Sequence, residues 1–342
     1  FVMRLLFIGF GTVGQGLAEI LVRKKELLSN TYDLDIQVVG IADKIKGSVY
    51  NPEGINLQEA LDKVDDGVAL SEMPGGRFEG EALDMIQQAE ADVMCEATYT
   101  DIETGEPATA HIRKAMECRM HVVTTNKGPV ALYYKDLNKL AEEKGVRFLF
   151  EVTVMSGTPL INFIRENLSG CDIQEINGIL NGTTNYILTR MEEGLSYEEA
   201  LKKAQELGYS EAVPDADVLG WDALAKVTIL AKYVFDADGK PFDYPCEGIT
   251  GITAGSISEA IARDKRFKLI GKVWREGSIV RASVAPEEID LAHPLASIMG
   301  ATNAVTITTD ALGDVTVVGP GAGKQATGFS MLVDLIEIGG QS

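Results

Sequence analysis

Four carboxylates precede a single lysine in the stretch EAVPDADVLGWDALAK. The acidic residues are Glu211, Asp215, Asp217 and Asp222, and the stretch ends at Lys226. The residues that follow, VTILAKYVF, are almost wholly apolar. A lysine among carboxylates at the beginning of an apolar segment can form a structural ion pair, or it can hold and release a proton.

The spacing of Asp222 and Lys226 predicts that their side chains are neighbours, because residues i and i+4 share one side of a helix. We expect this helix to begin at Asp217 or a neighbouring residue and to end near Phe235. It is apolar nearly all round, which is typical of a buried helix. A buried lysine needs its partner, since breaking a buried pair costs about 3–5 kcal/mol. A lysine held between burial and carboxylates can also exchange a proton.

Composition and charge limit the class of protein. At 342 residues the chain is long enough for two domains, and 45% hydrophobic with 24% charged residues is ordinary for a soluble globular protein. The net charge of −20 argues against a nucleic-acid partner, because phosphate binding needs a basic surface. No apolar run approaches the roughly 18 residues of a membrane span, and no secretory signal is visible, so we expect a cytoplasmic protein. The cysteines form no CxxC pair, so we expect no zinc site.

A glycine motif joins an apolar strand to a helical pattern at the beginning of the chain, in RLLFIGFGTVGQGLAEIL. Its spacing, GxGxxG, matches the dinucleotide fingerprint, in which the first glycine permits a tight turn, the second admits a pyrophosphate and the third lets the helix pack closely. The helix N-terminus would then bind the phosphates. A glycine turn in any strand–helix unit is the alternative. The residues that we expect at the cofactor are Gly9, Phe10, Gly11, Thr12, Val13 and Gly14.

The second strand, IQVVGIAD, ends at Asp43, where such folds place the acid that binds the adenosine ribose. Lys44 and Lys46 follow, and either could neutralise a 2′-phosphate. Asp43 therefore favours NAD while the lysines permit NADP, and both cofactors stay open.

Two later strands also end in polar residues. ADVMCEATYTD is expected to be a buried strand that ends near Thr98, and HVVTTNKGPVA a strand that runs out at Asn126 and Lys127. Ligands of doubly wound sheets bind at the carboxyl ends of the strands, so Thr98 and Lys127 are candidates for the ligand site. A lysine in a surface loop is the alternative for Lys127.

Glu151 lies within the apolar segment VRFLFEVTVMSGTP, which we interpret as a strand. A buried carboxylate is costly unless a cation or hydrogen-bond donors surround it. We therefore expect such partners, or else a register that turns Glu151 towards water.

Capping signals mark two helices in the middle of the chain. In NGTTN, Thr183 or Thr184 can cap the helix that begins NYIL. In SYEEALKKAQELG, Ser196 and Glu199 form a capping box and Gly208 supplies the stop, so we interpret this charged helix as structural.

The last part of the chain predicts strands followed by one helix. RFKLIGKVWREGSIVRASVAPEEI is typical of a hairpin around Glu276 and Gly277, and NAVTITTD and GDVTVVG are two further strands. GPGAGKQATGFSMLVDLIEI is a second glycine turn that leads into a helix. This helix cannot pack alone, so we expect it to return to the first domain.

Five motifs in order resemble those of homoserine dehydrogenase, over essentially the full length of the chain. They are GFGTVGQG, VVTTNKGPVA, NGTTNYIL, GYSEAVPDADVLGWDALAK and GPGAG with its helix. The resemblance implies an NAD(P)-dependent oxidoreductase that reversibly reduces L-aspartate 4-semialdehyde to L-homoserine, a step towards threonine and methionine. The expected ligands are therefore a small amino-acid substrate and NAD or NADP.

The resemblance also implies roles for individual residues. Lys226 resembles the acid/base lysine of the family, Asp222 the residue that positions it, and Lys127 a second active-site lysine close to nicotinamide and substrate. Glu211 and Asp217 resemble the residues that hold the substrate amino group. These roles fit the chemistry, because an ammonium group attracts carboxylates and the alkoxide that develops on the aldehyde oxygen attracts a lysine.

Further positions match cofactor and cation sites of the family. Those that resemble cofactor contacts are Gly182, Thr183 and Gly323. Those that resemble a monovalent-cation site, for sodium, are Glu151 and the backbone carbonyls of Val154, Ser156 and Thr158.

The expected fold is α/β: a Rossmann-type doubly wound parallel sheet, plus a second α+β domain with a mixed sheet used for catalysis and dimerisation. We expect the dinucleotide-binding domain at 1–131 with 321–342, the dimerisation region at 132–151 with 290–320, and the catalytic domain at 152–289. The resemblance implies a homodimer.

One position departs from the family pattern, which commonly has aspartate where this chain has Val213. We expect function to survive, because Glu211, Asp217, Asp222 and Lys226 remain. The alternatives are a related dehydrogenase of another amino-acid aldehyde and a catalytically idle dinucleotide-binding sensor. The sequence leaves open the nicotinamide preference, the effect of Val213, the physiological direction, feedback regulation and the cation requirement.

Overall fold

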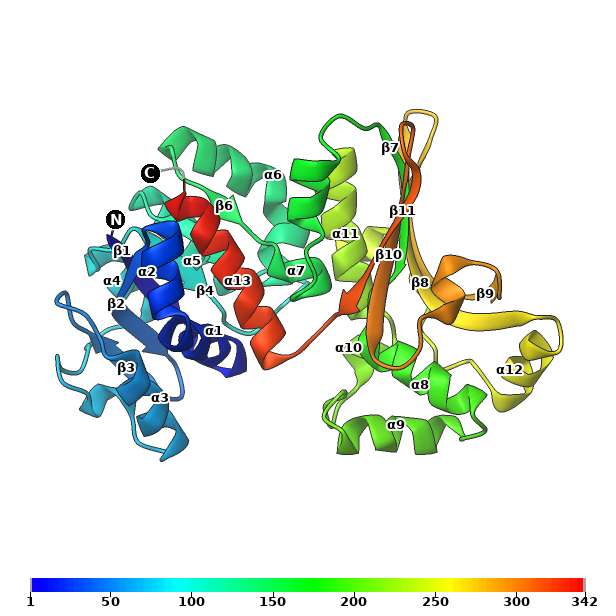
Figure 1. Cartoon of the computed structure of the whole chain (residues 1–342), viewed down its shortest axis with the longest axis horizontal. Coiled ribbons are helices and arrows are strands. Elements are labelled where there is room, and N and C mark those ends of the chain that lie inside the picture. Colours follow the sequence, from blue (N-terminus) through cyan, green and yellow to red (C-terminus); the bar gives the residue numbers. More distant parts are fainter. Residues whose placement is uncertain (1, 341–342) are drawn as a thin grey trace. The chain divides into compact units, whose positions relative to one another are not determined.

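The computed structural model describes residues 2–340, in which the chain divides into two units (Figure 1). The first unit is Phe1–Gly157 with Gly323–Ser342, and the second is Thr158–Ala322. Residues 1, 341 and 342, at the ends of the expected dinucleotide-binding domain, lie outside the described residues. The stretches 132–151 and 290–320, expected to form one dimerisation region, belong to different units.

The apolar runs of the first unit form a six-stranded sheet in the order β3-β2-β1-β4-β5-β6. Its strands are β1 (Val2–Ile8), β2 (Asp35–Asp43), β3 (Gly47–Tyr50), β4 (Val93–Glu96), β5 (His121–Thr124) and β6 (Phe148–Leu149). All neighbours are parallel except β2 and β3. The Rossmann-type sheet is therefore confirmed, with an antiparallel edge strand. The chain order reverses between β1 and β4, so the loops after these strands border the usual ligand crevice of such a sheet.

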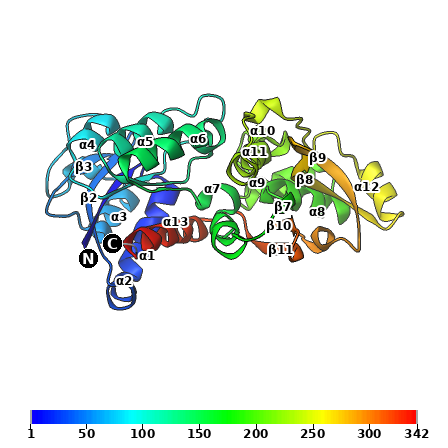
Figure 2. The same ribbon diagram turned by 90° about the horizontal axis from the view of Figure 1, so that it is seen from above.

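Helices cover both faces of this sheet, with α4, α5 and α6 on one face and α1 and α13 on the other (Figure 2). The helices are α1 (Thr12–Arg23), α2 (Lys25–Tyr32), α3 (Leu57–Asp65), α4 (Ala82–Gln88), α5 (Ala108–Glu117), α6 (Lys127–Lys144), α7 (Val152–Met155) and α13 (Lys324–Gly339), with a 3₁₀ turn η1 (Leu70–Glu72). Apolar side chains of β1, α1 and α13, such as Leu5, Leu17 and Leu335, are fully buried in one core.

The last helix returns to the first unit, as predicted, and packs along α1. The two backbones approach so closely that a Cβ at Gly16 would lie 2.3 Å from the carbonyl oxygen of Lys324. A Cβ at Gly328 would lie 2.5 Å from the carbonyl carbon of Gly16. An ion pair between Lys324 and Glu19, with 2.5 Å between Nζ and Oε1, also joins the two helices. The last glycine of GFGTVGQG therefore serves helix packing.

Two local expectations in the first unit need correction. Glu151 does not lie inside a strand, because β6 pairs with β5 over only two residues and the chain then turns at Phe150 into α7. The strand expected to run out at Asn126 and Lys127 ends at Thr124, and α6 begins at Lys127. There the Asn126 side chain accepts a hydrogen bond from the backbone N–H of Gly128 and caps the helix.

The second unit contains a five-stranded sheet in the order β11-β10-β7-β8-β9. Its strands are β7 (Ile173–Ile179), β8 (Lys265–Glu276), β9 (Ile279–Asp290), β10 (Thr302–Thr309) and β11 (Gly313–Pro320). Every neighbouring pair is antiparallel, so the expected mixed sheet is wrong. β8–β9 and β10–β11 are tight hairpins, turned at Gly277 and Gly313 with positive φ, and a tight turn can join only antiparallel strands. The remaining pairs depend on β7, which runs antiparallel to both of its distant neighbours, β10 and β8.

Five helices and three short turns complete the second unit. They are α8 (Gly182–Glu192), α9 (Tyr197–Glu206), α10 (Asp215–Val218), α11 (Trp221–Phe235), α12 (Ala254–Ile261), η2 (Phe163–Asn167), η3 (Pro241–Asp243) and η4 (Pro294–Ser297). Helix α11 packs against β8 and β9, and α8 against β8 and β10. Within residues 2–340 no helix has the length and apolar character that crossing a membrane requires.

The single helix expected from Asp217 to Phe235 is two helices, α10 and α11. The break falls at Gly220, whose φ of 84° is a left-handed conformation that glycine adopts without strain. The expected cap of α8 is also wrong, because Asn181, rather than a threonine, accepts the hydrogen bond from the N–H of Thr184. The capping box of Ser196 in α9 is confirmed.

The close packing of α1 on α13 predicts that Gly16→Ala and Gly328→Ala each lower the free energy of unfolding by about 1–3 kcal/mol, because the added methyl groups meet backbone atoms. This cost should exceed the roughly 1 kcal/mol that alanine gains over glycine in helix propensity. Urea unfolding followed by circular dichroism measures the difference.

Gly255→Ala is the matched control, since the nearest atom to a Cβ at that exposed helix position is Thr253 Oγ1 at 3.6 Å. Its stability should not fall, and it should rise by up to about 1 kcal/mol because alanine has the higher helix propensity. Equal stability of all three variants would contradict the packing argument.

Candidate active site

The glycine motif forms the turn from β1 into α1, and its three glycines play three different roles. Gly9 has a φ of 91°, and a Cβ there would lie 2.5 Å from the carbonyl oxygen of Ala97. A Cβ at Gly11 would meet no described atom within 4 Å, so the backbone is open to an incoming group. A Cβ at Gly14 would lie 2.7 Å from the carbonyl oxygen of Gly9. Turn, open approach and close packing follow the order of the dinucleotide fingerprint.

Asp43 at the end of β2 is tied to this turn. Its Oδ2 accepts a hydrogen bond from the N–H of Phe10 at 2.7 Å, and its Oδ1 accepts from Ile45 at 2.9 Å and Lys46 at 2.8 Å. Burial acts to raise the pKa of the Asp43 carboxyl, but these donors outweigh burial and hold the pKa below its ordinary value. Three of about four lone-pair sites are used, which leaves one on Oδ2 for a ligand hydroxyl.

The buried carboxylate of Glu96, at the polar end of β4, joins the loops after β4 and β5. Glu96 accepts hydrogen bonds from the hydroxyls of Thr98 and Thr124, the latter at 3.1 Å. The amide of Asn126 adds a bond to the carbonyl oxygen of Tyr99 at 2.7 Å. Thr98 and Asn126, and with it the first residue of α6, Lys127, therefore lie on two loops that are fixed to each other at the ligand edge of the sheet.

The remaining candidate positions of the first unit lie at turns. Gly323 has a φ of 128° and precedes the first turn of α13. Glu151 is 2% exposed, and its N–H donates to Asp334 Oδ2 at 3.3 Å. Ser156 ends α7 with a φ of 51°. Within the described residues no group of three or more His, Cys, Asp or Glu side chains could hold a metal ion, so a cation here would depend on backbone carbonyls.

In the second unit, Lys226 is 7% exposed on the apolar helix α11. Its Nζ lies 2.7 Å from Asp222 Oδ2, one helical turn earlier, which confirms the pair expected from the spacing. The same Nζ donates a hydrogen bond to the carbonyl oxygen of Leu180, also at 2.7 Å. Because an ammonium carries three N–H groups, these two contacts leave one for a ligand.

Asp217 joins this cluster through Asn181. The Asn181 amide nitrogen donates to Asp217 Oδ1 at 2.7 Å and to Asp222 Oδ2 at 3.0 Å. Burial, followed by the negative charge of Asp222, raises the pKa of the Asp217 carboxyl above its ordinary value. The Asn181 amide and the Lys226 ammonium act in the opposite direction. Asn181 was missed as a site residue, although its motif, NGTTN, had been noted for helix capping.

The other acidic residues of the opening stretch lie apart from this cluster. Glu211 and Asp215 are exposed, and no hydrogen bond or ion pair within residues 2–340 joins the Glu211 carboxylate to Lys226. Val213 is 73% exposed on the same loop. Thr183 is close to the cluster, because its hydroxyl lowers the pKa of the Asp217 carboxyl. The same hydroxyl donates a hydrogen bond to the carbonyl oxygen of Tyr209.

The start of α8 is also closely packed. A Cβ at Gly182 would lie 2.6 Å from the carbonyl oxygen of Ala301. Only glycine therefore fits at the first residue of this helix without moving the segment that precedes β10.

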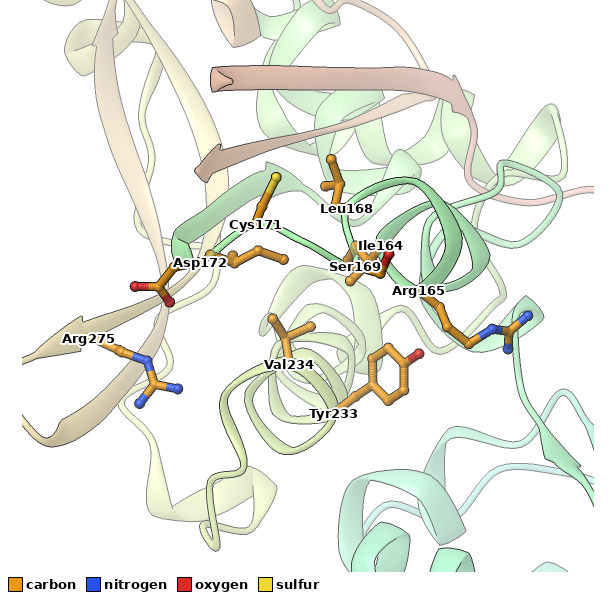
Figure 3. A pocket seen from close by; sticks show the side chains of 10 residues that line it. Ile164, Arg165, Leu168, Ser169, Cys171, Asp172, Tyr233, Val234 and Arg275 are labelled. Carbon is orange, nitrogen blue, oxygen red and sulfur yellow. The ribbon is translucent and has the colours of Figure 1, made fainter. Parts of the chain in front are cut away.

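A pocket of ≈ 330 Å³ lies elsewhere in the second unit, with Arg165 and Arg275 on opposite sides (Figure 3). Tyr233 and Val234 at the end of α11 also line it. Lys226 lies seven residues before Tyr233, roughly 10 Å along the helix axis. The pocket is therefore separate from the lysine–carboxylate cluster.

Each unit contains its own set of residues that could take part in chemistry. The first unit presents a glycine turn at a helix N-terminus, an ionised Asp43 and Lys127 at the ligand edge of a parallel sheet. The second presents a buried amine that two oxygen atoms hold in place, with a further carboxylate next to it. A nucleotide suits the first set, and proton transfer next to a cationic group suits the second.

Family models match both parts of the chain. The model for homoserine dehydrogenase matches residues 159–336, and the model for the homoserine dehydrogenase NAD binding domain matches residues 9–151. The NAD(+)-dependent homoserine dehydrogenase of Pseudomonas canavaninivorans is 42% identical over 337 residues, which cover 98% of this chain and 96% of the relative. The homoserine dehydrogenase of Methanocaldococcus jannaschii is 39% identical over 337 residues and 98% of both chains.

Solved structures give the same result. A putative homoserine dehydrogenase from Archaeoglobus fulgidus matches with a TM-score of 0.88 and 38% identity, over 98% of this chain and 99% of the other. A hyperthermophilic archaeal homoserine dehydrogenase in complex with NADPH matches with a TM-score of 0.83 and 30% identity, over 98% and 97%. With both parts of the chain matched and relatives aligned over nearly their whole length, the chain belongs to the homoserine dehydrogenase family.

Proposed function

We propose that the chain catalyses the reversible reduction of L-aspartate 4-semialdehyde to L-homoserine, with NAD(H) as the preferred cofactor. The observation that carries this proposal is the buried Lys226 amine, held by Asp222 and by the carbonyl oxygen of Leu180. An aldehyde reductase needs such a proton donor, and the relatives carry the name of this activity. The enzyme would act in the cytoplasm, on the route to threonine and methionine.

Lys226 supplies the proton of the reaction. When bound, the nicotinamide would supply the hydride that forms the new C–H bond at the aldehyde carbon. As the C=O double bond opens, its electron pair moves to the oxygen, and the Lys226 N–H gives its proton to that oxygen. In the reverse direction Lys226 removes the hydroxyl proton. Asp222 holds the amine during both steps, since the pair shares one side of α11.

Asp217 is proposed to bind the substrate ammonium. Its carboxylate lies near Lys226, the proposed proton donor, but accepts its hydrogen bond from the Asn181 amide. Glu211 is proposed as a second carboxylate for the same ammonium, from the exposed loop that precedes α10. A carboxylate loses hydration free energy when a ligand covers it, and Coulomb attraction to a bound ammonium restores part of that free energy.

The cofactor contacts are proposed at the turn of Gly9, Phe10, Gly11, Thr12, Val13 and Gly14, and at Asp43, Thr98, Lys127, Gly182, Thr183 and Gly323. Two features support NAD over NADP. The Asp43 carboxylate has its pKa held low, so it is ionised at neutral pH and would repel a 2′-phosphate. Its remaining lone-pair site suits a ribose hydroxyl. Lys127, at the first residue of α6, is proposed to lie near nicotinamide and substrate.

The reaction proposal predicts oxidation of NADH by aspartate semialdehyde, with a higher kcat/KM than with NADPH. Lys226→Ala should lower kcat by roughly 10²–10⁴-fold, because the proton then has no positioned donor. Lys232→Ala is the matched control, since Lys232 is a buried lysine on the same helix whose Nζ donates to the carbonyl oxygen of Asp238. Its kcat should stay near that of the parent.

Three outcomes would count against this reading. Turnover of another small amino-acid aldehyde in preference to aspartate semialdehyde would indicate a related dehydrogenase. Nicotinamide binding without any turnover would indicate a sensor. A Lys226→Ala variant with the parent kcat would remove the acid/base role.

A sodium ion is proposed at Glu151 and the carbonyls of Val154, Ser156 and Thr158. Glu151 and Asp334 are two buried carboxylic acids of one region, joined by the N–H of Glu151, and a hard cation would offset their charge. The left-handed backbone at Ser156 supports the proposal, because such a turn redirects successive carbonyls.

Sodium chloride should therefore stabilise the protein more than choline chloride at equal ionic strength. Above saturation, each tenfold rise in sodium should add about 1.4 kcal/mol to the free energy of unfolding. Thermal unfolding measures the effect, which Glu151→Gln should abolish and the exposed Glu117→Gln should leave intact. Equal stabilisation by the two salts would argue against a bound ion.

A homodimer is proposed through the sheet of the second unit, including the stretch 290–320. The edge strand β11 offers unpaired backbone groups, and its Val318 is half exposed, as in strands that pair with another chain.

Multi-angle light scattering should give the mass of two chains. Val318→Lys should shift the mass towards one chain, because a charge at the pairing edge opposes close approach. Leu207→Lys, at an exposed apolar position that ends α9, should not change the mass. A parent protein with the mass of one chain would refute the dimer.

A further inference from the structure

One amide group links two carboxylates that belong to different helices. The Asn181 Nδ2 atom donates to Asp217 Oδ1 on α10 at 2.7 Å and to Asp222 Oδ2 on α11 at 3.0 Å. Both N–H bonds of the amide are used in this way. The contact brings together two helices that Gly220 separates in the chain.

The orientation of this amide is fixed from its other end. Asn181 caps α8, and its Oδ1 accepts hydrogen bonds from the N–H and the hydroxyl of Thr184, at 2.9 and 3.0 Å. The amide nitrogen must therefore face the carboxylates. Asn181 is also 5% exposed, so water competes little for these bonds.

The neighbouring residue holds the amine. The carbonyl oxygen of Leu180 accepts the hydrogen bond from Lys226 Nζ. Two successive residues at the turn from β7 into α8 thus bind the ammonium through a carbonyl and the carboxylates through an amide.

The charges of the cluster explain why the amide matters. The charged groups that act on Asp217 are Asp222, which raises the pKa of its carboxyl, and Lys226, which lowers it, both on α11. From α8, the Asn181 amide and the Thr183 hydroxyl also lower the pKa of Asp217. Without the amide, two carboxylates would compete for one ammonium.

We propose that Asn181 is a positioning residue that separates the two carboxylates, so that Asp222 stays on Lys226 and Asp217 stays available to a substrate ammonium. The inference rests on the proposed function for the roles of Asp217 and Lys226. It gives Asn181 a role in the chemistry, which neither the resemblance to the family nor the spacing of the charged residues had indicated.

The test uses substitutions that keep the helix cap. Serine and aspartate both cap helices as well as asparagine does, but neither donates an amide N–H to a carboxylate. Asn181→Ser therefore removes the donor, and Asn181→Asp replaces it with a third negative charge. Asn177→Ser is the matched control, because Asn177 on β7 donates its amide to Glu175 at 2.9 Å, outside the cluster.

In full-length enzyme, Asn181→Ser should lower kcat/KM for homoserine by roughly 10–100-fold, the cost of a displaced catalytic group. The acid limb of the kcat/KM profile should move to higher pH by about one unit, because the ionised carboxylates lose a donor. Asn181→Asp should shift the limb further. Asn177→Ser should leave both the limb and kcat/KM unchanged.

A second measurement does not depend on turnover. In the folded parent the pKa of the Asp217 carboxyl is raised. Ionising this carboxyl therefore lowers the free energy of unfolding as the pH rises above the ordinary pKa of an aspartate, near 4. Asn181→Ser should increase that cost. Its loss of melting temperature relative to the parent should therefore be small near pH 4 and grow towards pH 7.5.

The proposal fails if Asn181→Ser keeps the parent kcat/KM and acid limb. It also fails if the loss of melting temperature is the same at every pH, because that would show a purely structural cap. If the parent protein turns over no homoserine, the proposed function fails, while the melting measurement still decides whether Asn181 separates the two carboxylates.

Discussion

A buried ammonium is the constraint around which the second unit is organised. Lys226 lies on a helix that is apolar on nearly every side, so its charge must be balanced locally or the helix could not be buried. Asp222 supplies the balancing charge one turn away, and Leu180 supplies a carbonyl from the end of β7. The sheet, the α8 turn and α11 are therefore connected through one amine.

Residues that interrupt helices and strands set the turns and hold the loops around the candidate site residues. Gly220, left-handed between α10 and α11, interrupts the helix, and Asp217 and Asp222 on its two sides both accept from the Asn181 amide. In the first unit, Gly9 makes a turn that another residue would block, and Glu96 fixes two loops in place. Both units thus combine apolar elements that fold by burial with a few backbone or polar positions that fix turns and loops.

Much of this arrangement could be predicted from short-range patterns. The strands and helix of the glycine motif, the Asp222–Lys226 pair and the hairpin at Gly277 all follow from periodicity, spacing or turn chemistry. Asn181 could not be found in this way, because its partners Asp217 and Asp222 are 36 and 41 residues away and meet it only through tertiary packing.

The failures have the same physical origin. An antiparallel rather than mixed second sheet depends on which distant strands pair, and the end of β6 depends on how far its neighbour β5 extends. The helix break at Gly220 was visible as a glycine. The space around it, however, is set by distant residues, because a Cβ at Gly220 would lie 3.0 Å from Cys246 Sγ and 3.3 Å from Val284 Cγ1 on β9.

The loop before α10 has a further consequence for how such an enzyme diversifies. Glu211 and Val213 are exposed and contribute little to the folded core, whereas Asp222, Lys226 and Asn181 are embedded in it. Substitutions in this loop should therefore cost little folding free energy and leave the hydrogen bonds among Asp222, Lys226 and Asn181 intact. The sequence of this loop can therefore diversify, and directed evolution could begin there without destabilising the scaffold.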